Sequence, residues 1–216
     1  MQPDERLRAE IRQLGRLLGQ VIREQAGLAF YELEEEIRLA ARERRDGREE
    51  AEGRLVERVR GLGDREARAI VRAFTIFFDL ANLAEDRQRV RVLRQRERER
   101  HPEPRSESVA DVVRILRDRG TTAEEIKQLL SRMRIEPVFT AHPTEAKRRT
   151  VRTAVRKLRE CMAILDREEL LPREREHHFA RIRALLTSLW QTDLIRPHPP
   201  TVLEEVEVGL HFASTL

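Results

Sequence analysis

The stretch Ile70-Val71-Arg72-Ala73-Phe74-Thr75-Ile76-Phe77-Phe78-Asp79-Leu80-Ala81-Asn82-Leu83-Ala84 decides the fold class of this chain. Its apolar residues recur at steps of three and four, which places one set of them on a single helical stripe: Ile70, Phe74, Phe77, Ala81 and Ala84. Asp64 precedes the stretch and suits the N-cap of the same helix. The pattern predicts a long amphipathic helix that buries one face against other helices.

The same period extends along most of the chain. At the N-terminus it is carried by Leu7, Ile11, Leu14, Leu18 and Val21. Glycines at 47, 61 and 63 separate two further predicted helices, over residues 28–45 and 48–61. Additional helices are predicted over residues 106–119, 122–133, 173–195 and 201–215, and a stripe of Val151, Val155, Leu158, Met162 and Leu165 predicts one more. The fold class is therefore mainly α.

One segment is predicted to be extended. Residues 135–140 form a short apolar run, in which Pro137 is compatible only with a strand start, an edge or a bulge. A single strand cannot form a sheet alone, so this strand near 135–140 needs partners. The charged run 87–100, by contrast, is interpreted as the solvated end of the long helix.

Composition narrows the class of protein. The 216 residues suffice for a sizeable core, and 38% charged against 4% aromatic residues is typical of long solvated helices. Basic and acidic residues, 43 and 39, are interleaved, so the net charge of +4 gives little support for nucleic-acid binding. No segment has the length or apolar character of a membrane span or a signal peptide, and Cys161 is the only cysteine. We therefore expect no membrane association, no internal disulfide and a cytoplasmic location.

The most informative site candidate is the stretch 138–150, Val-Phe-Thr-Ala-His-Pro-Thr-Glu-Ala-Lys-Arg-Arg-Thr. His142 precedes Pro143 and is therefore expected to be extended, whereas Pro143 suits the first position of a helix. Thr144 and Glu145 would then lie in the first helical turn. The pattern indicates a histidine that handles protons at the start of a helix, although a structural histidine would also fit.

Arg148 and Arg149 are expected one turn further along that helix. A helix N-terminus favours anions, and guanidinium groups beside it strengthen the preference. The two arginines therefore predict an anion site next to His142. Because the chain contains many arginines, ordinary solvated helix residues remain the alternative.

Four segments resemble one family. Residues 139–150, F-T-A-H-P-T-E-A-K-R-R-T, resemble the signature of the phosphoenolpyruvate carboxylases. The end of the long helix, L-A-N-L-A-E at 80–85, and L-W-Q-T-D-L-I-R-P at 189–197 are similar to two further family segments, and 200–206 follows the family's P-T-x-x-D/E-E pattern. Leu194 departs from the pattern, since the family usually has an acid there. The resemblance covers residues 70–216, and residues 1–60 share only a helical character.

The resemblance implies a fold and an activity. It implies the helical N-terminal part of an α-rich (β/α) barrel enzyme, with residues 135–140 as one barrel strand. The expected domains are a helical region at 1–104 and a second part at 105–216 that holds the strand and the histidine segment. The full-length protein would be a lyase that fixes carbon dioxide. It would combine phosphoenolpyruvate with bicarbonate to give oxaloacetate, a tricarboxylic acid cycle intermediate, and phosphate. Mg²⁺, allosteric control and a homotetramer are implied too.

The resemblance also assigns roles to the candidate residues. His142 would be the catalytic base that deprotonates carboxyphosphate, Arg148 and Arg149 would bind substrate anions with help from Thr144, and Glu145 would be an orienting residue. The family's metal ligands are expected outside this chain, which leaves none here. Because the family's enzymes are several times longer, we expect an inactive N-terminal fragment. The alternative is a non-catalytic helical anion-binding or assembly module derived from that family.

Overall fold

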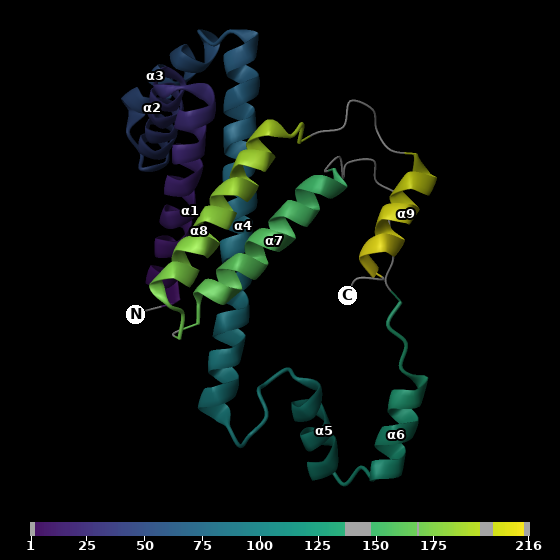
Figure 1. Cartoon of the computed structure of the whole chain (residues 1–216). Coiled ribbons are helices and arrows are strands. Elements are labelled where there is room, and N and C mark those ends of the chain that lie inside the picture. Colours follow the sequence, from purple (N-terminus) through teal and green to yellow (C-terminus); the bar gives the residue numbers. More distant parts are fainter. Residues whose placement is uncertain (1–2, 137–147, 168, 195–200, 214–216) are drawn as a thin grey trace. The chain divides into compact units, whose positions relative to one another are not determined.

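The computed structural model describes residues 3–136, 148–167, 169–194 and 201–213 (Figure 1). Within these ranges the chain forms nine α-helices and no strand: α1 (Pro3–Ala26), α2 (Leu28–Arg45), α3 (Glu49–Arg60), α4 (Asp64–Arg100), α5 (Val109–Asp118), α6 (Ala123–Arg132), α7 (Arg149–Leu165), α8 (Pro172–Gln191) and α9 (Val202–Ala213). None of the described helices combines the length and apolar character that a membrane crossing requires. The predicted mainly α fold class is confirmed.

The helices group into two compact units. The first contains residues 1–85 and 143–216, and the second contains residues 86–142, so α4 begins in one unit and ends in the other. The first unit is therefore discontinuous in sequence. The domain division expected at residue 104 lies inside the second unit and stays a prediction.

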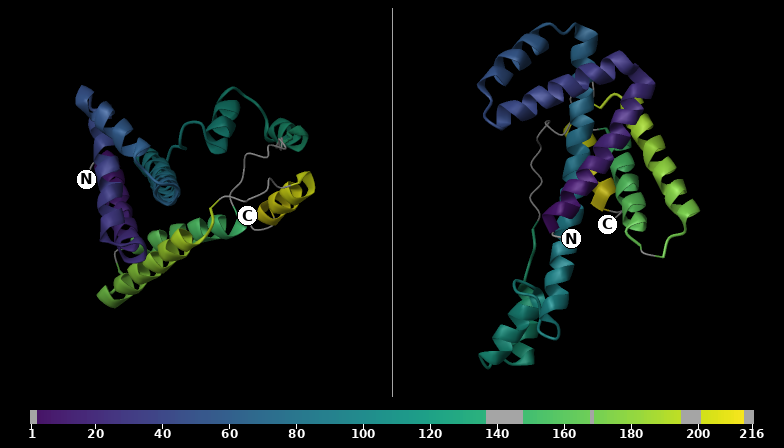
Figure 2. Two further views of the ribbon diagram at one scale, coloured as in Figure 1. Left: turned by 90° about the horizontal axis from the view of Figure 1, so that it is seen from above. Right: turned by 90° about the vertical axis from the view of Figure 1, so that its left-hand side faces the viewer.

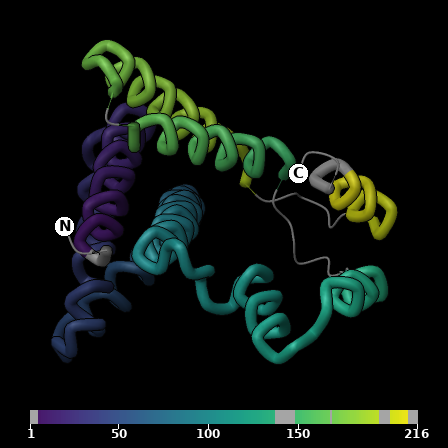
Figure 3. Tube along the Cα trace, turned by 90° about the horizontal axis from the view of Figure 1, so that it is seen from below, coloured from purple at the N-terminus to yellow at the C-terminus, as the bar shows by residue number. Residues whose placement is uncertain are grey.

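The core of the first unit is built from four helices. α1, the first half of α4, α7 and α8 contribute side chains to one continuous buried cluster, whose members include Leu18, Leu80, Leu158 and Leu186. α7 and α8 pack along each other, and α1 packs against α8, as two different views show (Figures 2 and 3). The apolar stripes predicted for residues 7–21 and 151–165 face this cluster, with the exception of Val155, which is not part of it.

The long helix buries a slightly different face from the predicted one. The helix itself is confirmed and begins at Asp64, but its most buried residues are Ala73, Ile76, Leu80, Leu83 and Ala84. Phe74, Phe77 and Ala81, which define the predicted stripe, are only half-buried at its margin. The shift follows from packing: Phe74 contacts a second cluster while Phe77 lines the main one, so the helix serves two cores.

That second cluster joins α2, α3 and α4 through Leu33, Ile37 and Ile70. Glu34 on α2 is also buried, with 8% of its surface exposed. Burial raises the pKa of its carboxyl group to about 7, and the nearby carboxylate of Glu35 adds to the effect, whereas Arg38 opposes it. A buried acid with a raised pKa favours the folded state only while it is protonated.

Replacing Glu34 with glutamine is expected to stabilise the chain at pH 8 by roughly 1–2 kcal/mol and to have little effect at pH 4. The wild-type carboxyl is neutral in the folded chain below its raised pKa, so its favourable contribution is lost as the pH rises from about 4.5 to about 7. Urea unfolding at both pH values measures the difference. Glu32→Gln, at an exposed position of the same helix, is the control. An equal gain at pH 4 would refute the explanation.

The second unit contains the end of α4, with α5 and α6. Ser108 caps α5, because its hydroxyl accepts the amide of Asp111 at 3.1 Å. Asp111 also pairs with Arg114 at 2.9 Å, and that contact lowers the pKa of the Asp111 carboxyl. At α6, Thr122 and Glu125 form a capping box, in which each side chain accepts the other residue's backbone amide.

Most of the predicted strand at 135–140 lies outside the described residues. Ile135 and Glu136 are described, and neither is in a strand, while Ile135 is 83% exposed. A strand is defined by hydrogen bonds to a neighbouring strand, and the described part of the chain offers none. For these two residues, the prediction of a strand is therefore wrong in the isolated chain.

Candidate active site

The predicted site residues fall into two groups. His142, Thr144 and Glu145 lie outside the described residues. Arg148 and Arg149 are described, and both lie at the start of α7. The structure therefore brings the two arginines together at one helix end, directly after the histidine segment.

The helix that follows the motif begins later than predicted. Arg148 is extended, with φ −63° and ψ 146°, and stands at the N-cap, so Arg149 is the first helical residue. The prediction of a helix that starts at Pro143 and includes both arginines is therefore wrong at Arg148. The first buried residue of the α7 stripe is Val151, and helices are stabilised mainly by packing of an apolar face. Upstream of Val151 the sequence offers no such face.

The start of α7 carries positive charge that no acid of its first turn offsets. That turn contains no acidic residue, and no side chain caps it; α2 shares both features, whereas α3, α5, α6 and α8 carry acids in the first turn. Arg149 is exposed there. Arg148 is half-buried, and its Nε has no hydrogen-bond acceptor among the described residues. Cations at a helix N-terminus are locally unfavourable, so this end has an excess of positive potential that an anion would neutralise.

α7 and α8 form an antiparallel pair joined by a short connection. The beginning of α7 and the end of α8 therefore lie at the same end of the pair. Arg148, which follows the histidine segment in the sequence, therefore lies at this end, as does the family-like W-x-T-D pattern of residues 190–193. The structure explains part of that pattern: the Thr192 hydroxyl donates to the Ser188 carbonyl at 2.6 Å, and Thr192 itself is extended, which ends α8 earlier than the predicted residue 195.

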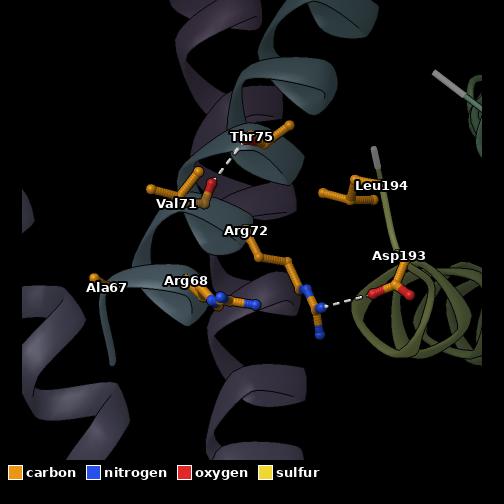
Figure 4. Close-up of a pocket in the computed structure, with 7 residues that line it drawn as sticks. All are labelled: Ala67, Arg68, Val71, Arg72, Thr75, Asp193 and Leu194. Atoms are coloured by element: carbon orange, nitrogen blue, oxygen red, sulfur yellow. Dashed lines mark hydrogen bonds and ion pairs between the residues drawn. The ribbon is translucent and has the colours of Figure 1, made fainter. Parts of the chain in front are cut away.

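A pocket of about 450 Å³ lies beside the end of α8 (Figure 4). Its described walls come from α4 and from the two residues after Thr192, and they comprise Ala67, Arg68, Val71, Arg72, Thr75, Asp193 and Leu194. None of the predicted site residues is among these. Leu194, where the family usually has an acid, is 8% exposed, so in this chain it packs as a core residue.

Sequence reasoning missed the partner of Asp193. Local spacing offers Arg196, three residues on, but Arg196 lies outside the described residues, and the described partner is Arg72 of α4 at 3.3 Å. The two positions are 121 residues apart, and no local spacing rule connects them. One signal was present in the sequence: the last turn of α8 has no basic residue of its own to complement the helix end.

The described residues contain no group of three or more histidine, cysteine or acidic side chains that could hold a metal. Glu174, His177 and His178 have a spacing that could suggest such a site. Glu174, however, accepts the Leu171 amide at 3.0 Å and so caps α8, while the two histidine rings stack edge to face at 5.6 Å. Cys161 is buried, and burial raises its thiol pKa.

Comparisons with a family model and with curated proteins point to the same family. A family model described as phosphoenolpyruvate carboxylase matches residues 7–216, so the likeness extends into the N-terminal helices. The phosphoenolpyruvate carboxylase of Roseiflexus castenholzii is 45% identical over 213 residues, covering 96% of this chain and 22% of that protein. The corresponding proteins of Thermus thermophilus and Acinetobacter baumannii are 41% and 37% identical, and each is covered to 23%. The chain thus spans less than a quarter of the length of these curated relatives, and it belongs to the phosphoenolpyruvate carboxylase family.

Proposed function

We propose that this chain supplies the histidine-bearing part of the active centre of a phosphoenolpyruvate carboxylase. The observation that carries the proposal is the start of α7, where two arginines and an acid-free first turn directly follow the family-like His-Pro-Thr-Glu segment. Such an end attracts the phosphate and carboxylate groups that this chemistry handles. The family relationship supplies the reaction class.

The proposed reaction has three steps. Bicarbonate takes the phosphoryl group of phosphoenolpyruvate, which gives carboxyphosphate and the enolate of pyruvate. Carboxyphosphate loses its proton to His142 and breaks down to carbon dioxide and phosphate. The enolate then attacks carbon dioxide to form oxaloacetate. Carboxyphosphate carries both a labile proton and dense negative charge, so a histidine and arginines are suitable partners.

In this proposal the remaining motif residues support His142. Arg148 and Arg149 hold phosphate or carboxylate charge at the start of α7, because a guanidinium group can donate paired hydrogen bonds to such an anion. Thr144 contributes to the anion site, and Glu145 orients its neighbours. Both remain predictions, since they lie outside the described residues.

The family relationship also implies Mg²⁺. The described residues do not fit a metal site, because they contain no suitable group of ligands. We therefore propose that the ligands come from the part of a family-length protein that this chain does not span, and no step above is assigned to the metal. Allosteric control, a homotetramer and a cytoplasmic location are proposed on the same family grounds.

A chimera tests the proposal. This chain would replace the matching segment of the Roseiflexus castenholzii protein, which is 45% identical to it. We expect the chimera to form oxaloacetate from phosphoenolpyruvate and bicarbonate when Mg²⁺ is present, and we expect the 216-residue chain alone to form none. A coupled malate dehydrogenase assay measures the product, and the unaltered relative is the positive control.

Two results would contradict this function. Metal-dependent oxaloacetate formation by the isolated chain would show that the active centre is complete within it. A chimera that has the circular dichroism and oligomeric state of the relative but no activity would favour the alternative, a non-catalytic anion-binding or assembly module.

A further inference from the structure

Arg72 makes a three-part contact with the end of α8. One guanidinium nitrogen donates to the backbone carbonyl of Trp190 at 3.0 Å, and the other donates to Asp193 at 3.3 Å. The guanidinium carbon also lies 6.0 Å from the centre of the Trp190 ring. Figure 4 shows the side chain reaching from α4 toward Asp193. Arg72 thus contacts both the last turn of α8, at Trp190, and Asp193, which lies just beyond the end of that helix.

The end of α8 requires such a contact. The last four carbonyl groups of a helix lack partners within it, and a cation near them is favourable. The last turn of α8 provides no basic side chain, so the cation comes from another helix. Trp190 is only 7% exposed, and its ring also contacts Phe30 of α2, with centroids 6.0 Å apart. Arg72 is therefore a helix cap contributed through the tertiary structure.

This contact lies at the functional end of the α7–α8 pair. The same end carries Arg148 and Arg149, which closely follow the histidine segment in the sequence. Because α7 packs along α8, anchoring the last turn of α8 to α4 also limits the movement of the first turn of α7.

We propose that Arg72 is a positioning residue: it fixes the end of α8 and thereby the placement of the anion-binding start of α7. The inference deepens the proposed function and rests on it for its kinetic consequence. The structural half of the proposal can be tested without any activity.

The first experiment uses Trp190, the only tryptophan of the chain, as a reporter. Arg72→Gln is expected to shift its fluorescence emission to longer wavelength and to increase quenching by acrylamide, because the cap and the covering guanidinium are lost. Arg72→Lys keeps the charge but not the paired donors, so it is expected to restore the signal only partly. Arg68→Gln, one turn earlier on α4 and exposed, is the matched control and should leave the spectrum unchanged.

The second experiment measures kinetics in the chimera. Small misplacements of a binding group can slow an enzyme strongly, so Arg72→Gln is expected to lower kcat by about 10- to 100-fold, with a much smaller change in KM for phosphoenolpyruvate. The assays are run well below the unfolding temperature, so that loss of folded protein does not contribute. Arg72→Lys should recover part of kcat.

The outcomes separate the two proposals. Unchanged emission and quenching in Arg72→Gln would overturn the contact itself. A changed spectrum with kcat equal to that of Arg68→Gln would overturn the positioning role and leave only a structural one. A folded chimera without activity before any Arg72 substitution would count against the proposed function, while the fluorescence result would still decide the contact.

Discussion

Replacing His142 with asparagine in the chimera is expected to reduce oxaloacetate formation by about 100-fold or more. Asparagine retains the size and part of the hydrogen-bonding capacity of histidine, but it cannot accept a proton near neutral pH. Under the proposed mechanism, phosphoryl transfer to bicarbonate does not require this base. Carboxyphosphate would therefore still form, and its hydrolysis would release phosphate without carboxylation.

The measurement follows two products in parallel. Oxaloacetate is detected by reduction to malate, and phosphate by a colorimetric assay, each with and without bicarbonate. We expect the ratio of phosphate to oxaloacetate to rise in His142→Asn. His177→Asn, at an exposed position of α8, is the control and should keep the wild-type ratio. Carboxylation at the normal rate by His142→Asn would remove this residue from the mechanism.

Replacing Leu186 with alanine is expected to destabilise the chain by about 3 kcal/mol. Leu186 on α8 is completely buried, and it belongs to the cluster that joins α8 with α1, α4 and α7. Removing its side chain loses apolar burial and leaves a cavity among four helices that cannot all collapse into it. The effect should exceed that of any single surface ion pair, which contributes at most about 1 kcal/mol.

Urea unfolding followed by circular dichroism measures this loss of stability. Leu203→Ala is the matched control, since it makes the same chemical change on α9 at a position that is 77% exposed. We expect that variant to stay within about 0.5 kcal/mol of the wild type. Equal destabilisation by the two substitutions would contradict the assignment of Leu186 to the core.

Local sequence signals predicted the helices well because their causes are local. The stripe at residues 7–21 and the breaks at Gly47 and Gly61 depend on residues within a few positions of one another. Each signal reappears as a helix or a helix boundary in the structure. The end of α8 was placed four residues too late: the backbone turns extended at Thr192, and apolar spacing does not reveal that change.

The candidate site was predictable only as a pattern. The order of His142, Arg148 and Arg149 along the chain indicated proton and anion chemistry, and the family relationship gave it a reaction class. The placement of the arginines was not predictable in the same way. Arg148 lies before α7 rather than inside it, because the helix begins where its buried face begins.

The sequence by itself determined that this protein is a bundle of amphipathic helices with a carboxylase-like histidine segment, since periodicity, capping residues and motifs are properties of neighbouring residues. Only the tertiary structure decided which face of α4 is buried, where α7 begins and which residue holds Asp193. Those outcomes depend on competition among surfaces that are far apart in the chain, as with Arg72 and the end of α8, which are more than 100 residues apart. Spacing along the chain carries no information about such pairs, and packing selects them because it must satisfy the exposed end of one helix with a side chain of another.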